Sequence, residues 1–262
     1  MRWWRTRARP RRGGAVSAEI LVREFTVLTI FPQMFPGPLG FGVVGRAFAD
    51  ERLVLDVRDL RAWADPPHRQ VDDETFGGGA GMVLKPEPLF RAVEAIRAET
   101  PPRSLHVVLL DPGGRRFDQA AARELAGYER LVLICGRYEG VDERVRRRLV
   151  DEELSIGDYV LCGGELAAMV VVEATARLAP GVVGRAESVA EESFEASLLD
   201  HPHYTRPAEF AGLEVPEVLR SGHHEQIESW RRQAALDRTR RQRPDLLARA
   251  VTEDDARKGE NR

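Results

Sequence analysis

LVLICGRYEGVDERVRRRLVDEELSIGDYVLCGGE, residues 131–165, is the stretch that decides the fold. It opens with an apolar run, 131–135, that stops at Gly136, as a buried strand does where its backbone turns. Residues 141–150 then place apolar side chains at helical spacing among charges, and a second apolar segment, 154–162, leads to paired glycines. Two glycine-bearing loops are therefore expected to follow two strands of one α/β unit, which is where open α/β sheets bind ligands.

The glycines of these loops leave the backbone open to a ligand, because glycine has no Cβ. No Lys-Ser or Lys-Thr pair follows them, so the loops lack the lysine and the hydroxyl that a P-loop offers to a nucleoside triphosphate. The pattern predicts a nucleoside that is held mainly by backbone groups.

The same alternation of apolar runs and helical patterns extends on both sides of this stretch. Further strands are expected at 25–31, 53–57 and 105–110, and helices at 43–51, 86–99, 117–125 and 165–179. Alternating strands and helices favour an α/β fold with a mainly parallel sheet and helices on both faces. A turn at 111–114 would bring a third glycine loop to the same pocket.

The composition is that of a globular protein, with 43% hydrophobic and 31% charged residues and a formal net charge of −3. The longest apolar stretch, 166–178, contains Glu173 and Arg177 and is too short to cross a bilayer. We therefore expect no membrane segment and a cytoplasmic location. Cys135 and Cys162 both lie in apolar runs, so we interpret them as small buried hydrophobic residues rather than as a disulfide or metal ligands.

Residues 40–45, GFGVVG, match the sequence pattern of a dinucleotide-binding fingerprint, but their surroundings do not. A functional fingerprint leaves its strand directly through the first glycine, whereas three prolines separate these glycines from a strand that ends near Phe31. We expect no NAD binding there.

Composition divides the chain into four parts. Residues 1–23 are basic and aperiodic, which predicts a disordered tail or else an arm that touches RNA. The α/β domain is expected over 24–182, a flexible linker over 183–200 and a small helical domain over 201–262. This last domain has seven arginines and Trp230 between residues 228 and 249, which suits RNA phosphates and a stacked base, or else a solvated helix with one buried tryptophan.

One further loop stands out within the first domain. Residues 61–83 are polar and end in a glycine-rich run, so they form either a flexible surface loop or a loop that a ligand or partner orders.

Five sequence blocks closely resemble the bacterial tRNA (guanine-N1)-methyltransferases of the TrmD type, in the SPOUT superfamily. The blocks are VDDETFGGGAGM at 71–82, CGRYEGVDERV at 135–145, SIGDYVLCGGE at 155–165, HPHYTRP at 201–207 and GLEVPEVLRSGHH at 212–224. The resemblance covers most of residues 25–248 in order. It implies a deep trefoil knot in the parallel sheet, which patterning alone would not suggest because knots are rare. It also implies a homodimer with shared active sites and a tRNA substrate that the C-terminal domain holds.

The resemblance implies that S-adenosylmethionine is the methyl donor and that it binds in the three glycine loops. The implied donor-binding residues are Asp111, Pro112, Gly113, Gly136, Tyr138, Glu139, Ile156, Gly157, Tyr159, Leu161, Gly163 and Gly164. The implied tRNA-contacting residues are Asp72, His203, Tyr204, Arg206, Ser221 and His223. Mg²⁺ is also implied, with Glu139 as a candidate ligand. The sequence has no metal signature of its own, and His201 and His203 are expected to face RNA or the subunit interface.

The implied reaction is methylation at N1 of the guanine immediately 3′ of the anticodon, position 37. That nitrogen carries a proton, and its lone pair is delocalised into the ring carbonyl, so a base must remove the proton while a cation holds the charge that develops on O6. The family's arginine matches Arg177, and its aspartate base matches Glu192, with Glu191 as the alternative. A glutamate moves the carboxylate by about one bond length, and a shift of that size can slow a positioned reaction ~100-fold. Two alternative functions remain: another SPOUT RNA methyltransferase, and a homologue that binds RNA without catalysis.

Overall fold

The structure, a computed structural model, describes residues 20–99, 105–184, 193–194 and 198–248. The chain divides into two compact units, with the boundary between Val183 and Gly184. The predicted tail lies almost wholly outside the described residues, as does most of the predicted linker.

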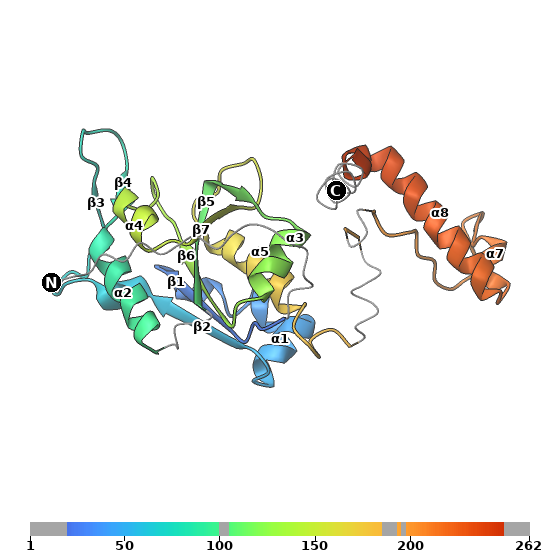
Figure 1. Ribbon diagram of the computed structural model, residues 1–262, viewed down its shortest axis with the longest axis horizontal. Helices are drawn as coiled ribbons and strands as arrows, with labels where there is room; N and C mark the ends of the chain where they lie inside the picture. The colour runs from blue at the N-terminus through green and yellow to red at the C-terminus, as the bar shows by residue number, and fades with distance from the viewer. Residues whose placement is uncertain (1–19, 100–104, 185–192, 195–197, 249–262) are drawn as a thin grey trace, which may run out of the picture. The chain divides into compact units, whose positions relative to one another are not determined.

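A five-stranded parallel sheet is the centre of the first unit (Figure 1). Its strands, in spatial order, are β2 (Val54–Asp59), β1 (Glu24–Thr29), β6 (Arg130–Cys135), β5 (Leu105–Arg116) and β7 (Glu152–Ser155). Every pairing in this sheet is parallel, so the predicted α/β class and parallel sheet are confirmed.

Helices cover both faces of the sheet, because alternate residues of a central strand point to opposite sides. Leu131 and Leu133 of β6 belong to one buried cluster, whereas Val132 and Ile134 belong to the other. The first cluster includes residues of α1 (Gly42–Ala49), α3 (Gln119–Ala126) and α5 (Glu165–Ala176). The second includes residues of α2 (Pro86–Glu99) and α4 (Glu143–Arg148).

Two helices of this unit begin at aspartates that cap them. The Asp118 carboxylate accepts a hydrogen bond from Ala121 N at 3.0 Å before α3, and Asp142 accepts one from Arg144 N at 2.8 Å before α4. Such bonds satisfy backbone donors that the first helical turn leaves open. The two aspartates therefore stabilise the first turns of α3 and α4.

The predicted turn at 111–114 is wrong, since β5 continues to Arg116. The pairing with β7 shifts register between Leu110 and Arg115, so the intervening residues bulge out of the ladder. Gly114 makes this possible because a Cβ there would lie 2.4 Å from Leu154 N. The glycines accommodate a bulge, and the strand then resumes.

The polar loop at 61–83 contains structure that the sequence pattern did not predict. A short 3-10 helix, η3 (Leu60–Trp63), precedes an antiparallel pair of strands, β3 (Asp72–Glu74) and β4 (Met82–Leu84). The glycine-rich residues join these two strands, and the loop projects from the unit (Figure 1).

The glycines of the 40–45 fingerprint do not directly follow a strand. After β1, the short 3-10 helices η1 (Pro32–Met34) and η2 (Pro38–Gly40) precede α1. The expected end of the first strand before the prolines is confirmed.

The second unit contains a long helix, α8 (His224–Gln242), a short helix, α7 (Glu217–Arg220), and a pair of two-residue strands, β8 (Glu209–Phe210) and β9 (Leu213–Glu214). Residues 199–200, which precede β8, are hydrogen-bonded to α8. Leu199 N donates to Thr239 Oγ1 at 2.8 Å, and Arg238 Nη1 donates to the carbonyl of Asp200 at 3.2 Å.

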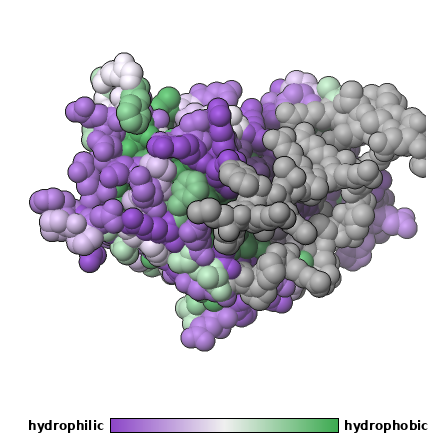
Figure 2. All heavy atoms as spheres, turned by 60° about the vertical axis from the view of Figure 1, so that its left-hand side comes forward, coloured by the Kyte–Doolittle hydropathy of each residue, from purple (hydrophilic) through white to green (hydrophobic). Residues whose placement is uncertain are grey.

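Within the described residues, no helix has the length and apolar character needed to cross a membrane. The face shown in Figure 2 is mostly hydrophilic, with only small apolar patches among the described atoms. The apolar side chains of the first unit are concentrated in the two clusters beside the sheet.

Candidate functional site

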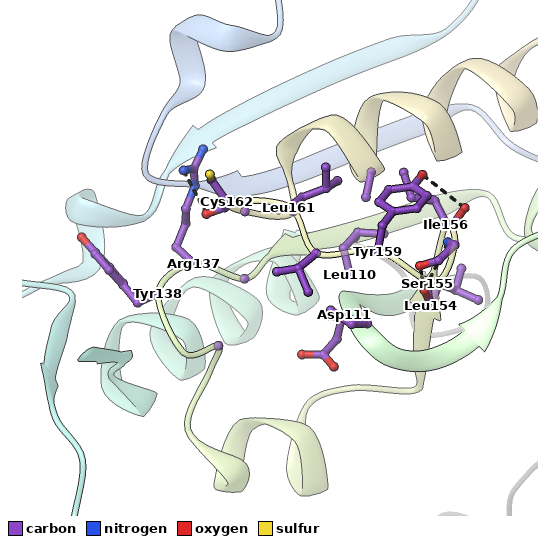
Figure 3. Close-up of a pocket in the computed structure, with 18 of the residues that line it drawn as sticks. Leu110, Asp111, Arg137, Tyr138, Leu154, Ser155, Ile156, Tyr159, Leu161 and Cys162 are labelled. Atoms are coloured by element: carbon purple, nitrogen blue, oxygen red, sulfur yellow. Dashed lines mark hydrogen bonds between the residues drawn. The ribbon is translucent and has the colours of Figure 1, made fainter. Parts of the chain in front are cut away.

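A pocket of about 260 Å³ lies between the bulge of β5 and the carboxyl ends of β6 and β7 (Figure 3). Three segments line it: 110–112 from β5, 136–140 after β6, and most of 154–164 around and after the end of β7. The carboxyl ends of parallel strands meet at one edge of a sheet, so the sequence brings these segments together.

The pocket gathers all the predicted donor-binding residues except Gly113. Gly113 instead donates its backbone N–H to Asp111 Oδ1 at 2.9 Å and so orients that carboxylate. Sequence reasoning missed the lining residues Arg137, Ser155 and Cys162, although they lie inside the blocks that carry the resemblance. Cys162 is exposed, so its interpretation as a buried residue is wrong, whereas Cys135 is buried as expected.

The loop after β7 returns to lie beside the loop after β6. Gly164 N donates to the carbonyl of Gly136 at 2.9 Å, and Arg137 forms an isolated antiparallel bridge with Gly163. Because β5 separates β6 from β7 in the sheet, the returning loop has to cross β5. This crossing is compatible with the knot that the resemblance implies, and the threading of the chain stays a prediction.

The backbone of the β7 loop is shaped by a local set of hydrogen bonds. Ser155 Oγ donates to the carbonyl of Gly157 at 3.1 Å and accepts from its N–H at 3.3 Å. Gly157 has a φ of 154°, and a Cβ on it would lie 2.5 Å from the ring of Tyr159. Only glycine therefore lets the tyrosine fold back over the loop, where its hydroxyl donates to the Ile156 carbonyl at 3.4 Å (Figure 3).

An ionised carboxylate stands at the edge of the pocket. Burial raises the pKa of Asp111, but hydrogen bonds from Arg146 and from Gly113 N–H outweigh burial and hold that pKa below its ordinary value. Arg146 also pairs with Glu153, which fixes its position. Asp111 is therefore an oriented acceptor that suits a hydroxyl or an ammonium group of a ligand.

The β3–β4 pair is joined to the loop after β6. Glu139 N donates to the Met82 carbonyl at 2.9 Å, and Leu84 N donates to the Gly140 carbonyl at 3.0 Å. Burial, together with the charge of Asp72 and a hydrogen bond to it, raises the pKa of Tyr138. The structure thus brings Asp72, a predicted tRNA-contacting residue, next to a pocket residue.

Arg177, one of the two predicted catalytic residues, does not line the pocket. Arg177 is the half-buried residue that ends α5, and its backbone N donates to the Glu173 carbonyl at 3.3 Å. Glu192 and its alternative, Glu191, lie outside the described residues.

The remaining predicted tRNA-contacting residues belong to the second unit, and their side chains are exposed. They are His203, Tyr204, Arg206, Ser221 and His223. Trp230 of α8 is half-buried, with the rings of His201 and Tyr204 6.5 Å and 6.3 Å from its own. An aromatic cluster therefore lies beside the exposed residues.

Within the described residues, one group of three side chains is arranged so that it could share a metal ion: Asp200, His201 and His203. Its members are already bonded to each other, since the Asp200 carboxylate lies 2.8 Å from His201 Nδ1 and 2.7 Å from His203 Nε2. Glu139 is not part of this group.

The comparison with known proteins concerns almost the whole described chain. A family model described as tRNA (Guanine-1)-methyltransferase TrmD matches residues 23–249. The chain belongs to the TrmD family. The TrmD match begins one residue before β1 and ends just after the last described residue, so it covers both units.

Individual TrmD relatives agree with the family model. A protein of Chloroflexus aggregans is 57% identical over 87% of this chain and 89% of its own length. One of Geobacter sulfurreducens is 54% identical over 87% and 92%, and one of Listeria innocua is 51% identical over 86% and 91%. All three are named tRNA (guanine-N(1)-)-methyltransferase, so this chain is a member of an enzyme family.

Proposed function

We propose that the protein transfers the methyl group of S-adenosylmethionine to N1 of the guanine at position 37, immediately 3′ of the anticodon, in tRNA. The observation that carries the proposal is a pocket between the bulge of β5 and the loops after β6 and β7, in a chain that the TrmD family model matches over both units. A tRNA substrate also suits a cytoplasmic location.

The groups around the pocket fit an adenosine-containing donor. Leu110, Ile156 and Leu161 offer an apolar wall to a purine (Figure 3). Loop backbone groups can hydrogen-bond its edge, and the ionised Asp111 suits a hydroxyl or an ammonium group. These three kinds of contact match the apolar, polar and charged parts of S-adenosylmethionine.

The chemistry requires a base and a positive charge at the guanine. When bound, the donor supplies an electrophilic methyl group on a positively charged sulfur, which keeps the bonding electron pair as a thioether. We assign the base to Glu192, whose carboxylate would take the N1 proton as the new N–C bond forms. We assign to Arg177 a hydrogen bond to O6, which would hold the negative charge that deprotonation moves onto that oxygen.

Paired variants separate the two candidate bases. Glu192→Gln should abolish methyl transfer and leave donor binding intact, because the amide cannot accept the proton. Glu191→Gln should keep most of the activity and serves as the matched control. The reverse result would assign the base to Glu191, and full activity in both variants would show that neither residue is the base.

We further propose a homodimer, supported by an exposed apolar face on α5. The side chains of Leu166 and Val170 lie one helical turn apart and are 51% and 45% exposed. Val160, in the adjoining loop, is 87% exposed. Leu166→Glu should convert the dimer to a monomer in sedimentation velocity, whereas a wild-type protein that sediments as a monomer would contradict the proposal.

We propose Mg²⁺ as a cofactor, with Glu139 as a protein ligand. Glu139 is exposed and lines the pocket, so the other ligands would come from substrate and water, as Mg²⁺ commonly arranges. Chelation should abolish methyl transfer and added Mg²⁺ should restore it. Unchanged activity in excess chelator would rule the metal out.

Transfer of a tritiated methyl group to tRNA transcripts tests the reaction itself. A transcript with guanine at position 37 should be labelled, and one with adenine there should not. Transcripts with and without a guanine at position 36 test whether the preceding base matters. Labelling of ribosomal RNA alone would favour another SPOUT methyltransferase, and donor binding without transfer would favour a non-catalytic RNA-binding protein.

A further inference from the structure

An ion pair between a pocket-lining arginine, Arg137, and a buried carboxylate, Glu165, lies at the edge of the pocket. Glu165 is the first residue of α5, and its side chain is only 1% exposed. Its Oε2 accepts from Arg137 Nε at 2.9 Å and from Nη2 at 2.8 Å, and its Oε1 accepts from Thr29 Oγ1 at 2.7 Å. Glu165 therefore ties the end of β1 to the loop after β6.

The arginine of this pair has further contacts. Its Nη1 donates to the Cys162 carbonyl at 3.2 Å, and its guanidinium carbon lies 4.6 Å from the ring centre of Phe31. Figure 3 shows the Arg137 side chain turned towards Cys162. The guanidinium is thus a fixed positive charge beside the pocket, and Glu165 neutralises it.

A contribution to the stability of the fold is a weak explanation for the presence of this ion pair. Replacing a buried ion pair by apolar residues of similar volume is often neutral or stabilising. Arg137 also lines the pocket, so its charge acts on whatever binds there. An unneutralised charge on Arg137 and a charge on a ligand about 8 Å away would change the binding constant of that ligand by about 30-fold at an effective dielectric constant of about 20. At an effective dielectric constant of about 40 the change would be about 6-fold.

We propose that Glu165 neutralises Arg137 so that the pocket accepts a cationic sulfonium donor, and that the pair sets the affinity for the donor relative to the uncharged product S-adenosylhomocysteine. The inference rests on the proposed function, because it takes these two molecules as ligands. Both residues are positioning residues, since they act through charge and loop geometry.

Calorimetric titration of both ligands into four full-length proteins tests the proposal: wild type, Glu165→Gln, Arg137→Gln and the double variant. In Glu165→Gln, the uncompensated guanidinium should raise the dissociation constant of S-adenosylmethionine about 6- to 30-fold more than that of S-adenosylhomocysteine. The double variant has no net charge change, so its ratio of the two constants should return to within about twofold of wild type. Glu124→Gln is the control, because Glu124 is an exposed residue paired with Arg115 outside the pocket lining.

Equal weakening of both ligands in Glu165→Gln would overturn the proposal, because it would show a structural role only. Should Glu165→Gln fail to fold, the other two variants decide the matter. Arg137→Gln leaves an unpaired carboxylate, so it should favour the cationic ligand relative to the double variant, and identical ratios in these two proteins would overturn the proposal. A wild type that binds neither ligand would instead contradict the proposed function.

Discussion

Replacement of Gly163 by alanine should break the ion pair of Arg137 and Glu165 although neither charged residue is itself replaced. A Cβ at Gly163 would lie 2.1 Å from Arg137 Nε and 2.5 Å from its Cδ. An arginine side chain usually moves aside cheaply, but this one is bonded to Glu165 and packed on Phe31. The clash therefore has to be relieved at the expense of the pair.

The expected cost follows from the burial of the two partners. Breaking a buried ion pair costs about 3–5 kcal/mol because one charge is left without its partner. Arg137 is 17% exposed and can turn towards water, whereas Glu165 is 1% exposed and cannot. We therefore expect Gly163→Ala to lower the free energy of unfolding by about 3 kcal/mol, out of a total of about 5–15 kcal/mol for a typical protein.

Urea denaturation of a double-mutant cycle measures this cost. Arg137→Ala removes the atoms that clash, so in that background Gly163→Ala should change the free energy of unfolding by less than about 1 kcal/mol. Gly37→Ala is the control, because a Cβ there meets nothing within 4 Å, and it should stay within about 0.5 kcal/mol of wild type. The reasoning is refuted if Gly163→Ala also stays within that range, or if its cost is the same with and without Arg137.

Three further predictions concern the chemistry, the pocket and acid stability. Arg177→Gln should lower the rate constant of methyl transfer about 10²- to 10³-fold with little change in donor affinity. An unchanged rate constant in single-turnover kinetics would show that Arg177 does not take part in the reaction. Iodoacetamide should label the exposed Cys162 and not the buried Cys135, because burial raises the pKa of the Cys135 thiol. S-adenosylmethionine should slow the labelling of Cys162, which lines the pocket. Mass spectrometry measures the labelling, and a rate that the donor does not change would show that the donor binds elsewhere. The pKa of Asp111 lies below its ordinary value of about 4, so its ionised form stabilises the fold above that pH. This stabilisation is lost as the pH falls through the folded-state pKa. In urea denaturation below about pH 4, the free energy of unfolding should therefore fall less in Asp111→Asn than in wild type.

The sheet could be predicted from the sequence because its central strands are apolar on both faces. The residues of β6 are all buried, and such runs are recognisable without tertiary information. The glycines that follow β6 and β7 likewise indicated the pocket, because strand ends of a parallel sheet converge.

Features that depend on contacts distant in sequence could not be predicted from local patterns. The bulge in β5 results from the pairing of Arg115 with Leu154, and no local signal distinguishes it from a turn. Cys162 is exposed because the chain leaves the sheet after Ser155, so its apolar neighbours form a pocket wall instead of a strand. The pairing of Arg137 with Glu165 joins the loop after β6 to the first residue of α5, and these two segments meet only in the fold.

Mass spectrometry of nucleosides from a methylated tRNA transcript tests the proposed reaction most directly. The purified protein, S-adenosylmethionine and Mg²⁺ should produce 1-methylguanosine in the digestion fragment that contains position 37, and a transcript with adenine at that position should yield none. A methyl group on another atom or nucleotide, or no methylation under conditions where the protein binds both the donor and tRNA, would contradict the proposed function.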